Sequence, residues 1–147
     1  FVHSDVIALD ISKRALEIVK ENCLRTGIDV ETLNLDILSH KIIEHFDNDF
    51  DIIVSNPPYI TETELNNLNL DHEPRSALLV PDNDPLLFYQ ALLELSNKKL
   101  KTGGHLFVEC SEFYALEVFE LFKNGGLRNV EIKKDMQGKN RMIRAEK

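Results

Sequence analysis

Residues 51–59 restrict the possible folds of this chain more than any other segment. In them an apolar run stops at an asparagine, which is followed by two prolines and a tyrosine. Residues 52–54 are short, apolar and β-branched, which favours a buried strand. Pro57 and Pro58 cannot donate a hydrogen bond to a neighbouring strand, so the strand must end at Asn56. Ligands of open α/β sheets bind beyond the carboxyl ends of strands. This segment therefore predicts a binding site, with a proline-stiffened strand end as the alternative.

Strand-like and helix-like segments alternate along the rest of the chain. Their periodicity predicts strands at 5–10, 30–35, 51–55, 105–110, 130–133 and 142–145, and helices at 13–26, 37–46, 85–103 and 112–124. This alternation predicts an α/β fold with a mostly parallel sheet and helices on both faces. No helix separates the last two strands, so we expect that pair to be antiparallel.

Capping residues set the expected helix boundaries. Ser12 is a favourable N-cap, and Gly27 is a favourable C-cap for the first helix. Asp84 before Pro85 predicts the start of the third helix. Gly103 and Gly104 together predict its end rather than a phosphate-binding loop. In the last helix, the residues expected to point inward are Leu116, Phe119 and Phe122.

Composition narrows the class of protein. The chain has 147 residues, enough for one domain, and a net charge of −8, which disfavours tight non-specific binding of nucleic acid. Cys23 and Cys110 are far apart in sequence and are expected to be buried thiols in a reducing compartment. The histidines show no metal-ligand spacing, and no metal site is expected. Neither a signal peptide nor a long apolar segment is found, so we expect a cytoplasmic protein.

Acidic residues follow or end several predicted strands. Asp10 suits a bidentate hydrogen bond to ribose hydroxyls, although it can also serve as a helix cap. Asp36 can accept from an exocyclic amine such as that of adenine, or cap the segment after it. Glu109 lies within a predicted strand, where a carboxylate is costly unless it is paired or faces a crevice. Its alternative role is to satisfy a buried donor.

Several of these segments together resemble a known family. The sequence VIALDIS at residues 6–12, then Asp36, then VSNPPYI at residues 54–60 are similar to class I S-adenosylmethionine methyltransferases. The chain more closely resembles the bacterial peptide chain release factor N5-glutamine methyltransferases. Further matches are His72-Glu73-Pro74 with Ala77-Leu78, Gly103-Gly104 leading to Glu109, and the segment 138–141. The resemblance extends over nearly the whole chain and implies a Rossmann-like sheet.

The resemblance also implies a reaction and its residues. The family transfers a methyl group from S-adenosyl-L-methionine to the side-chain amide nitrogen of the glutamine in the Gly-Gly-Gln loop of release factors. Cofactor contacts are expected from Asp10, Asp36, Ile37 and Asn56, and substrate contacts from Asn56, Pro57, Pro58, Tyr59 and Glu73. Asn56, Pro57 and Tyr59 are expected to be catalytic.

These residue types suit methylation of an amide. An amide nitrogen is a poor nucleophile because its lone pair is delocalised into the carbonyl group. Acceptor oxygens of the Asn56 side chain and the Pro57 backbone would orient the nitrogen and stabilise its developing positive charge. Tyr59 would pack on the planar amide as a wall of the pocket. No general base is required before transfer, since the product can lose its proton afterwards.

The chain also departs from the family pattern. Family members open with a strand, a Gly-rich turn that holds the methionine part of the cofactor, and an upstream helical domain. We therefore expect residues 1–147 to be a partial methyltransferase domain that lacks these parts. The absent strand would lie between the strands that end at Asp10 and Asn56. Either direct pairing of those strands or association with another chain is expected to fill the gap.

Three alternatives remain open at this stage. A nucleic-acid methyltransferase acting on adenine or guanine would use the same Asn-Pro-Pro-Tyr sequence, with the tyrosine stacked on a flipped base. The acidic charge and the few adjacent basic residues disfavour it. An inactive fragment acting as a binding module is the second alternative. A nicotinamide dinucleotide domain would use Asp10, but gives no reason for residues 56–59.

Overall fold

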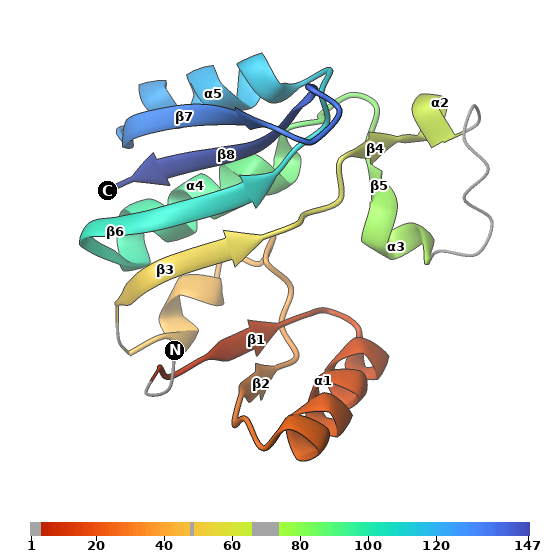
Figure 1. Cartoon of the computed structure of the whole chain (residues 1–147), viewed down its shortest axis with the longest axis vertical. Coiled ribbons are helices and arrows are strands. Elements are labelled where there is room, and N and C mark those ends of the chain that lie inside the picture. The colour runs from red at the N-terminus through yellow and green to blue at the C-terminus, as the bar shows by residue number, and fades with distance from the viewer. Residues whose placement is uncertain (1–3, 48, 66–73) are drawn as a thin grey trace. The chain divides into compact units, whose positions relative to one another are not determined.

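The computed structural model describes residues 4–47, 49–65 and 74–147 (Figure 1). The chain forms two compact units, Phe1–His45 and Phe46–Lys147, and each is described by itself. None of the helices in the described residues is both long and apolar enough to cross a bilayer.

The first unit contains a parallel strand pair and one long helix. Strands β1 (Ile7–Leu9) and β2 (Glu31–Leu33) pair in parallel, and α1 (Lys13–Thr26) connects them. The Ser12 hydroxyl accepts a hydrogen bond from the Ala15 N–H at 3.3 Å, which caps the start of α1. Gly27 ends the helix with φ 69°, a left-handed conformation that glycine adopts without steric penalty. The predicted helix and both of its caps are confirmed.

The predicted helix at 37–46 is wrong in extent. Only the 3-10 helix η1 (Ile42–His45) forms there. The Asp36 side chain accepts from the Leu38 N–H at 2.9 Å, and its carbonyl accepts from the Ser39 N–H at 3.0 Å. These local bonds stabilise a turn in place of the first helical turn, as aspartate side chains commonly do. The predicted strand at 30–35 is also shorter than expected.

The second unit is built on a four-stranded sheet in the order β3-β6-β8-β7. Strand β3 (Phe50–Ser55) pairs in parallel with β6 (Leu100–Glu109), which pairs antiparallel with β8 (Asn140–Glu146). Strand β7 (Arg128–Lys134) completes the sheet antiparallel to β8, so the predicted antiparallel pair is confirmed. Beyond β3, β4 (Ile60–Thr61) pairs with β5 (Leu79–Val80), next to the short helices α2 (Glu62–Leu65) and α3 (Arg75–Leu78).

One face of this sheet is covered by helices α4 (Leu87–Lys99) and α5 (Ala115–Asn124), which contact each other and the strands. The core between them contains fully or almost fully buried side chains: Tyr89, Leu92, Leu106, Val108, Phe122 and Ile143. Inward-pointing residues of β6 alternate along the strand, as the period of two requires. This packing fixes the carboxyl ends of β3 and β6 beside each other, since the register pairs Ser55 with Val108.

The opposite face of the sheet exposes apolar side chains. Val54 is 73% exposed and Ile52 46%, so the prediction of a buried strand at residues 52–54 is wrong for these two side chains. Phe107 pairs with Val54 and lies on the same face. Among the described strands, β3 pairs with β6 alone and is an edge of its sheet. The expectation that a further strand of the family fold would lie on the other edge of β3 stays a prediction.

Gly103 and Gly104 lie within β6, so their prediction as a helix end is wrong. The register between β3 and β6 shifts between Phe50 and Ile52, opposite these glycines. A Cβ on Gly104 would lie 3.1 Å from the carbonyl oxygens of both Phe50 and Asp51, a tighter contact than most Cβ atoms make, so the close approach of β3 favours glycine.

Two helix starts also differ from the prediction. Helix α4 begins at Leu87, because Asp84 and Pro85 belong to the preceding turn, where the Leu87 N–H bonds to the Asp84 carbonyl. Helix α5 begins at Ala115 after a turn from Ser111. Ala115, Val118 and Phe122 define the buried face of α5. Leu116 lies outside this face and is 65% exposed, contrary to prediction, whereas the prediction that Phe122 points inward is confirmed.

Candidate functional site

The sequence Asn56-Pro57-Pro58-Tyr59 directly follows strand β3 and leads into β4. Pro57 is buried, which fixes the path of the backbone, whereas Asn56 is exposed. The Asn56 side chain forms no hydrogen bond with any residue that the structure describes. Its amide is therefore available to a ligand at the carboxyl end of the parallel pair of strands.

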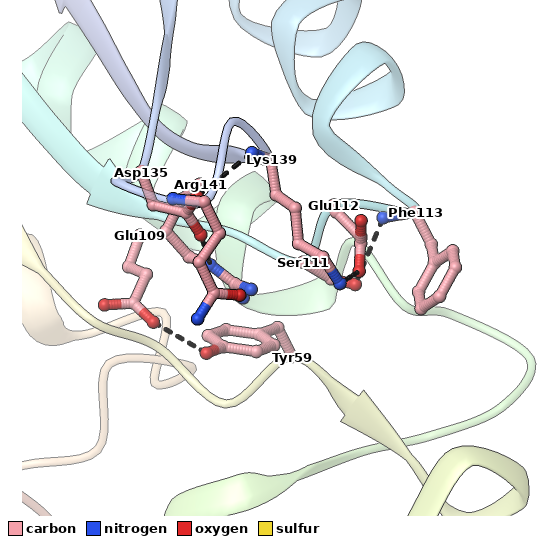
Figure 2. Close-up of polar contacts among 9 residues, drawn as sticks. Tyr59, Glu109, Ser111, Glu112, Phe113, Asp135, Lys139 and Arg141 are labelled. Carbon is pink, nitrogen blue, oxygen red and sulfur yellow. Dashed lines mark hydrogen bonds and ion pairs between the residues drawn. The ribbon is translucent and has the colours of Figure 1, made fainter.

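Tyr59 is held by a contact across the site. Its hydroxyl donates to Oε1 of Glu109 at 2.6 Å, which joins the segment after β3 to the last residue of β6 (Figure 2). The backbone carbonyl of Glu109 accepts from the Tyr89 hydroxyl at 3.1 Å. Because Tyr89 is fully buried in α4, the main chain at Glu109 is fixed to the core. Of the roles left open for Glu109 by the sequence, the structure shows a carboxylate paired with the Tyr59 hydroxyl.

The environment of Tyr59 raises the pKa of its phenol to about 12. Burial is the largest cause, and the hydrogen bond and negative charge of Glu109 act in the same direction, while Arg141 opposes them. The ordinary value for tyrosine is about 10. Tyr59 therefore keeps its proton near neutral pH and is a hydrogen-bond donor there, not a base.

Arg141 approaches this contact from strand β8. Its Nε lies 3.5 Å from Oδ2 of Asp135, and Figure 2 shows its side chain beside Tyr59. Oδ1 of Asp135 accepts from the backbone N–H groups of Gln137 at 2.9 Å and Lys139 at 3.0 Å. These bonds order the turn between β7 and β8. The backbone carbonyl of Arg141 accepts from the Cys110 N–H at 2.8 Å, which fixes the turn against the end of β6.

A separate ion pair lies near the site. Lys139 Nζ is 2.6 Å from Oε1 of Glu112, and neither side chain bonds to Tyr59 (Figure 2). Cys110 is fully buried, and burial raises the pKa of its thiol to about 11, so the thiol stays protonated. Cys23, on α1, is only partly buried. Among the described residues, no group of acidic, histidine or cysteine side chains is arranged to bind a metal ion.

In the first unit, the ends of β1 and β2 carry the other predicted site residues. Oδ1 of Asp10 accepts from the Ser12 N–H at 2.7 Å. The Asn34 side chain donates to the carbonyl oxygens of Asp10 at 3.0 Å and Ile11 at 2.8 Å, so it joins the two strand ends. Oδ2 of Asp10 accepts no hydrogen bond within the described residues, and Asp36 is exposed. A partly exposed carboxylate with a free oxygen fits a ribose hydroxyl, so these groups fit an adenosine-containing cofactor.

The predicted site residues belong to two units of the chain, which are described separately. Residues 56–59 are consecutive in the second unit, and Tyr59 among them bonds to Glu109. Asp10, Asp36 and Ile37 belong to the first unit and are described there. Glu73 lies outside the described residues.

Sequence reasoning missed the parts played by Arg141, Asp135 and Tyr89. Arg141 had two signals, its place directly after the polar loop between the last two strands and its position in the matching segment 138–141. Tyr89 had none beyond its position on an apolar helix.

Comparisons with known proteins agree with this architecture. Residues 2–72 match the methyltransferase small domain. The chain is 36% identical over 145 residues to the release factor glutamine methyltransferase of Flavobacterium psychrophilum, covering 97% of this chain and 50% of that protein. It is 39% identical over 143 residues to the corresponding protein of Bacteroides thetaiotaomicron, covering 95% and 51%. The chain thus spans about half the length of these relatives.

A solved structure shows the same fold. The crystal structure of a methyltransferase from Pyrococcus furiosus matches with a TM-score of 0.68 at 20% identity, covering 97% of this chain and 62% of that chain. This likeness confirms the predicted Rossmann-like α/β fold.

Proposed function

We propose that this chain, a relative of the release factor glutamine methyltransferases, is part of an enzyme that methylates the glutamine amide nitrogen in the Gly-Gly-Gln loop of release factors. The observation that carries the proposal is the end of β3. An exposed Asn56 amide, without a hydrogen bond to any described residue, lies between a strand end and a tyrosine whose hydroxyl is bonded to Glu109. Such a site offers acceptor oxygens and an aromatic wall to a planar amide.

The substrate amide would be held by the strand end. Its N–H groups would donate to the side-chain oxygen of Asn56 and the carbonyl of Pro57, with Pro58 and Glu73 as further contacts. The ring of Tyr59 would pack against the amide plane and exclude water from one side. Orientation of this kind reduces the entropic barrier of a bimolecular transfer, and the two acceptor dipoles favour the positive charge that develops on nitrogen.

The cofactor proposed for this reaction is S-adenosyl-L-methionine, which supplies an electrophilic methyl group on a sulfonium. Asp10 would accept from its ribose hydroxyls through the oxygen that Ser12 leaves free. Asp36 and Ile37 would border the adenine. Asn56 is proposed to contact the cofactor as well as the substrate.

No residue at the end of β3 has to remove a proton before transfer. The phenol of Tyr59 stays protonated because burial and Glu109 raise its pKa to about 12. An amide that has gained a methyl group becomes acidic enough to lose its proton to water. We therefore assign orientation and charge stabilisation to this site, with no general base.

The test is a transfer assay with the full-length protein that carries this chain. The protein is incubated with methyl-labelled S-adenosyl-L-methionine and either an intact release factor or one whose loop is changed to Gly-Gly-Ala. Label on the intact factor alone would support the proposal. Equal labelling of both factors would overturn the assigned glutamine, and label appearing only in added DNA or RNA would favour a nucleic-acid amine as the substrate.

A further inference from the structure

The hydrogen bond between Tyr59 and Glu109 restrains the orientation of the tyrosine ring. The two residues are 50 positions apart in sequence, and their side chains meet at 2.6 Å where β3 and β6 end. A hydrogen bond from a phenol to a carboxylate is short and about twice as strong as one between neutral groups. The ring of Tyr59 is thus attached at both ends, by its own backbone and by its hydroxyl.

Glu109 is itself held from behind. Its backbone carbonyl accepts from the hydroxyl of Tyr89, which is fully buried in the core, and its Cα pairs with Met142 in the sheet. The carboxylate that accepts the hydrogen bond from Tyr59 therefore projects from a rigid strand. A site residue supported in this way keeps its geometry better than one supported by a loop.

The positively charged side chain of Arg141 also lies beside Tyr59 (Figure 2). Asp135 bonds to the Arg141 side chain and to two backbone N–H groups of the same turn, so the guanidinium is fixed by the hairpin. The charge acts on the Tyr59 phenol in the direction opposite to that of Glu109. Tyr59 is thus flanked by one carboxylate and one guanidinium, both supplied by rigid strands.

We propose that Glu109 is a positioning residue for methyl transfer, fixing the plane of the Tyr59 ring against the substrate amide, with Arg141 as the opposing charge. This inference rests on the proposed function and adds to it a residue that orients Tyr59. No proton moves along the contact during the reaction, because Tyr59 remains the donor and Glu109 the acceptor throughout. The carboxylate acts through Tyr59 and does not touch the reacting nitrogen.

The kinetic test uses the full-length protein with Glu109→Ala, Glu109→Gln and the control Glu112→Ala. Glu112 is a glutamate close in sequence that pairs with Lys139 and makes no contact with Tyr59. Loss of ring orientation should lower kcat about tenfold to hundredfold in Glu109→Ala, with KM for the release factor changed less than about threefold. Glu109→Gln keeps an acceptor oxygen and should recover most of that loss. A kcat for Glu109→Ala equal to that of the Glu112→Ala control would overturn the proposal.

A double-mutant cycle separates positioning from general destabilisation. Glu109→Ala should have little further effect on kcat once Tyr59→Phe has removed the hydroxyl, because both substitutions break one contact. Multiplicative losses in the double variant would show that Glu109 acts independently of Tyr59 and would contradict the inference.

A third measurement does not depend on activity. The absorbance of ionised phenol is titrated in the full-length protein and in Glu109→Ala, each compared with its Tyr59→Phe counterpart to isolate one tyrosine. Tyr59 should ionise at clearly lower pH in Glu109→Ala, and an unchanged titration would exclude the contact itself. If the wild-type protein transfers no methyl group to release factors, the proposed function fails, while this titration still decides whether Glu109 holds Tyr59.

Discussion

The ends of β1 and β3 both present polar side chains, but they are held in different ways. Asp10, after β1, accepts from the Ser12 N–H two residues away. Tyr59, after β3, is fixed by Glu109, which is 50 residues later in the sequence. The Asp10 side chain is held by its own turn, although Asn34 at the end of β2 also donates to the Asp10 backbone carbonyl. The position of the Tyr59 hydroxyl depends instead on the packing of β6 and β8 in the second unit. A change in the second unit's sheet should therefore disturb the site at β3 and leave the turn after β1 intact.

The largest expected effect is that of Asn56→Ala on activity. Removing a preorganised group that stabilises transition-state charge costs about 10²–10³ in kcat. We expect a loss of that order in the full-length enzyme, with a nearly unchanged melting temperature because Asn56 is exposed and unbonded within the described chain. Initial rates of methyl transfer measure it.

The matched control for this change is Asn22→Ala, on the exposed side of α1. It should keep wild-type activity. Wild-type turnover in Asn56→Ala would show that the end of β3 is structural and would remove the proposed amide pocket.

The next largest effect concerns the end of β1. Asp10→Asn keeps an oxygen for the Ser12 N–H but loses the negative charge, so the turn should persist while cofactor binding weakens. Hydrogen bonds to charged groups contribute about 1.5–3 kcal/mol, which corresponds to about tenfold to hundredfold in affinity. Isothermal titration of the full-length protein with S-adenosyl-L-methionine checks it, with Asp29→Asn as the exposed control. Unchanged affinity would show that Asp10 only stabilises the turn after β1 and does not bind the cofactor.

A smaller effect is expected from removing the helix cap. Ser12→Ala deletes the hydroxyl that accepts from the Ala15 N–H and should destabilise α1 by about 1 kcal/mol. Hydrogen exchange of the α1 amides measures this local loss, and Ser12→Asn, which can also cap, should restore most of the protection. Exchange in β6 should not change. Equal loss of protection in both strand-end regions would contradict their independence.

The smallest effect concerns stability at high pH. The pKa of Tyr59 is about 12 in the folded protein against about 10 when unfolded, so its contribution to stability is complete below pH 10. As the pH rises from about 10 towards 12, the unfolded state loses its proton first and this contribution declines. Chemical denaturation of wild type and Tyr59→Phe across this range should show a shallower decline in the variant. Identical slopes would mean that folding does not raise the pKa of Tyr59.

The same contrast explains what the sequence could predict. Ser12, Gly27 and the strand before Asn56 were recognised because their signals are local: a cap, a left-handed glycine and two prolines. Gly104 misled because its role is set by β3, which approaches it closely from about 50 residues away in sequence, whereas Gly103 adopts a left-handed φ of 80° within β6. The Asp36 turn replaced a helix that the apolar pattern alone favoured. The partnership of Tyr59 with Glu109 and Arg141 required the fold itself, since no spacing in the sequence encodes it.

The proposed function requires that the end of β3 binds a glutamine amide for methylation. The most direct measurement is mass spectrometric mapping of a release factor after incubation with the full-length protein and S-adenosyl-L-methionine. We expect one added methyl group, on the side-chain nitrogen of the glutamine in the Gly-Gly-Gln loop, and none with Asn56→Ala. A methyl group on any other residue, or an unmodified factor in the presence of folded enzyme and bound cofactor, would contradict it.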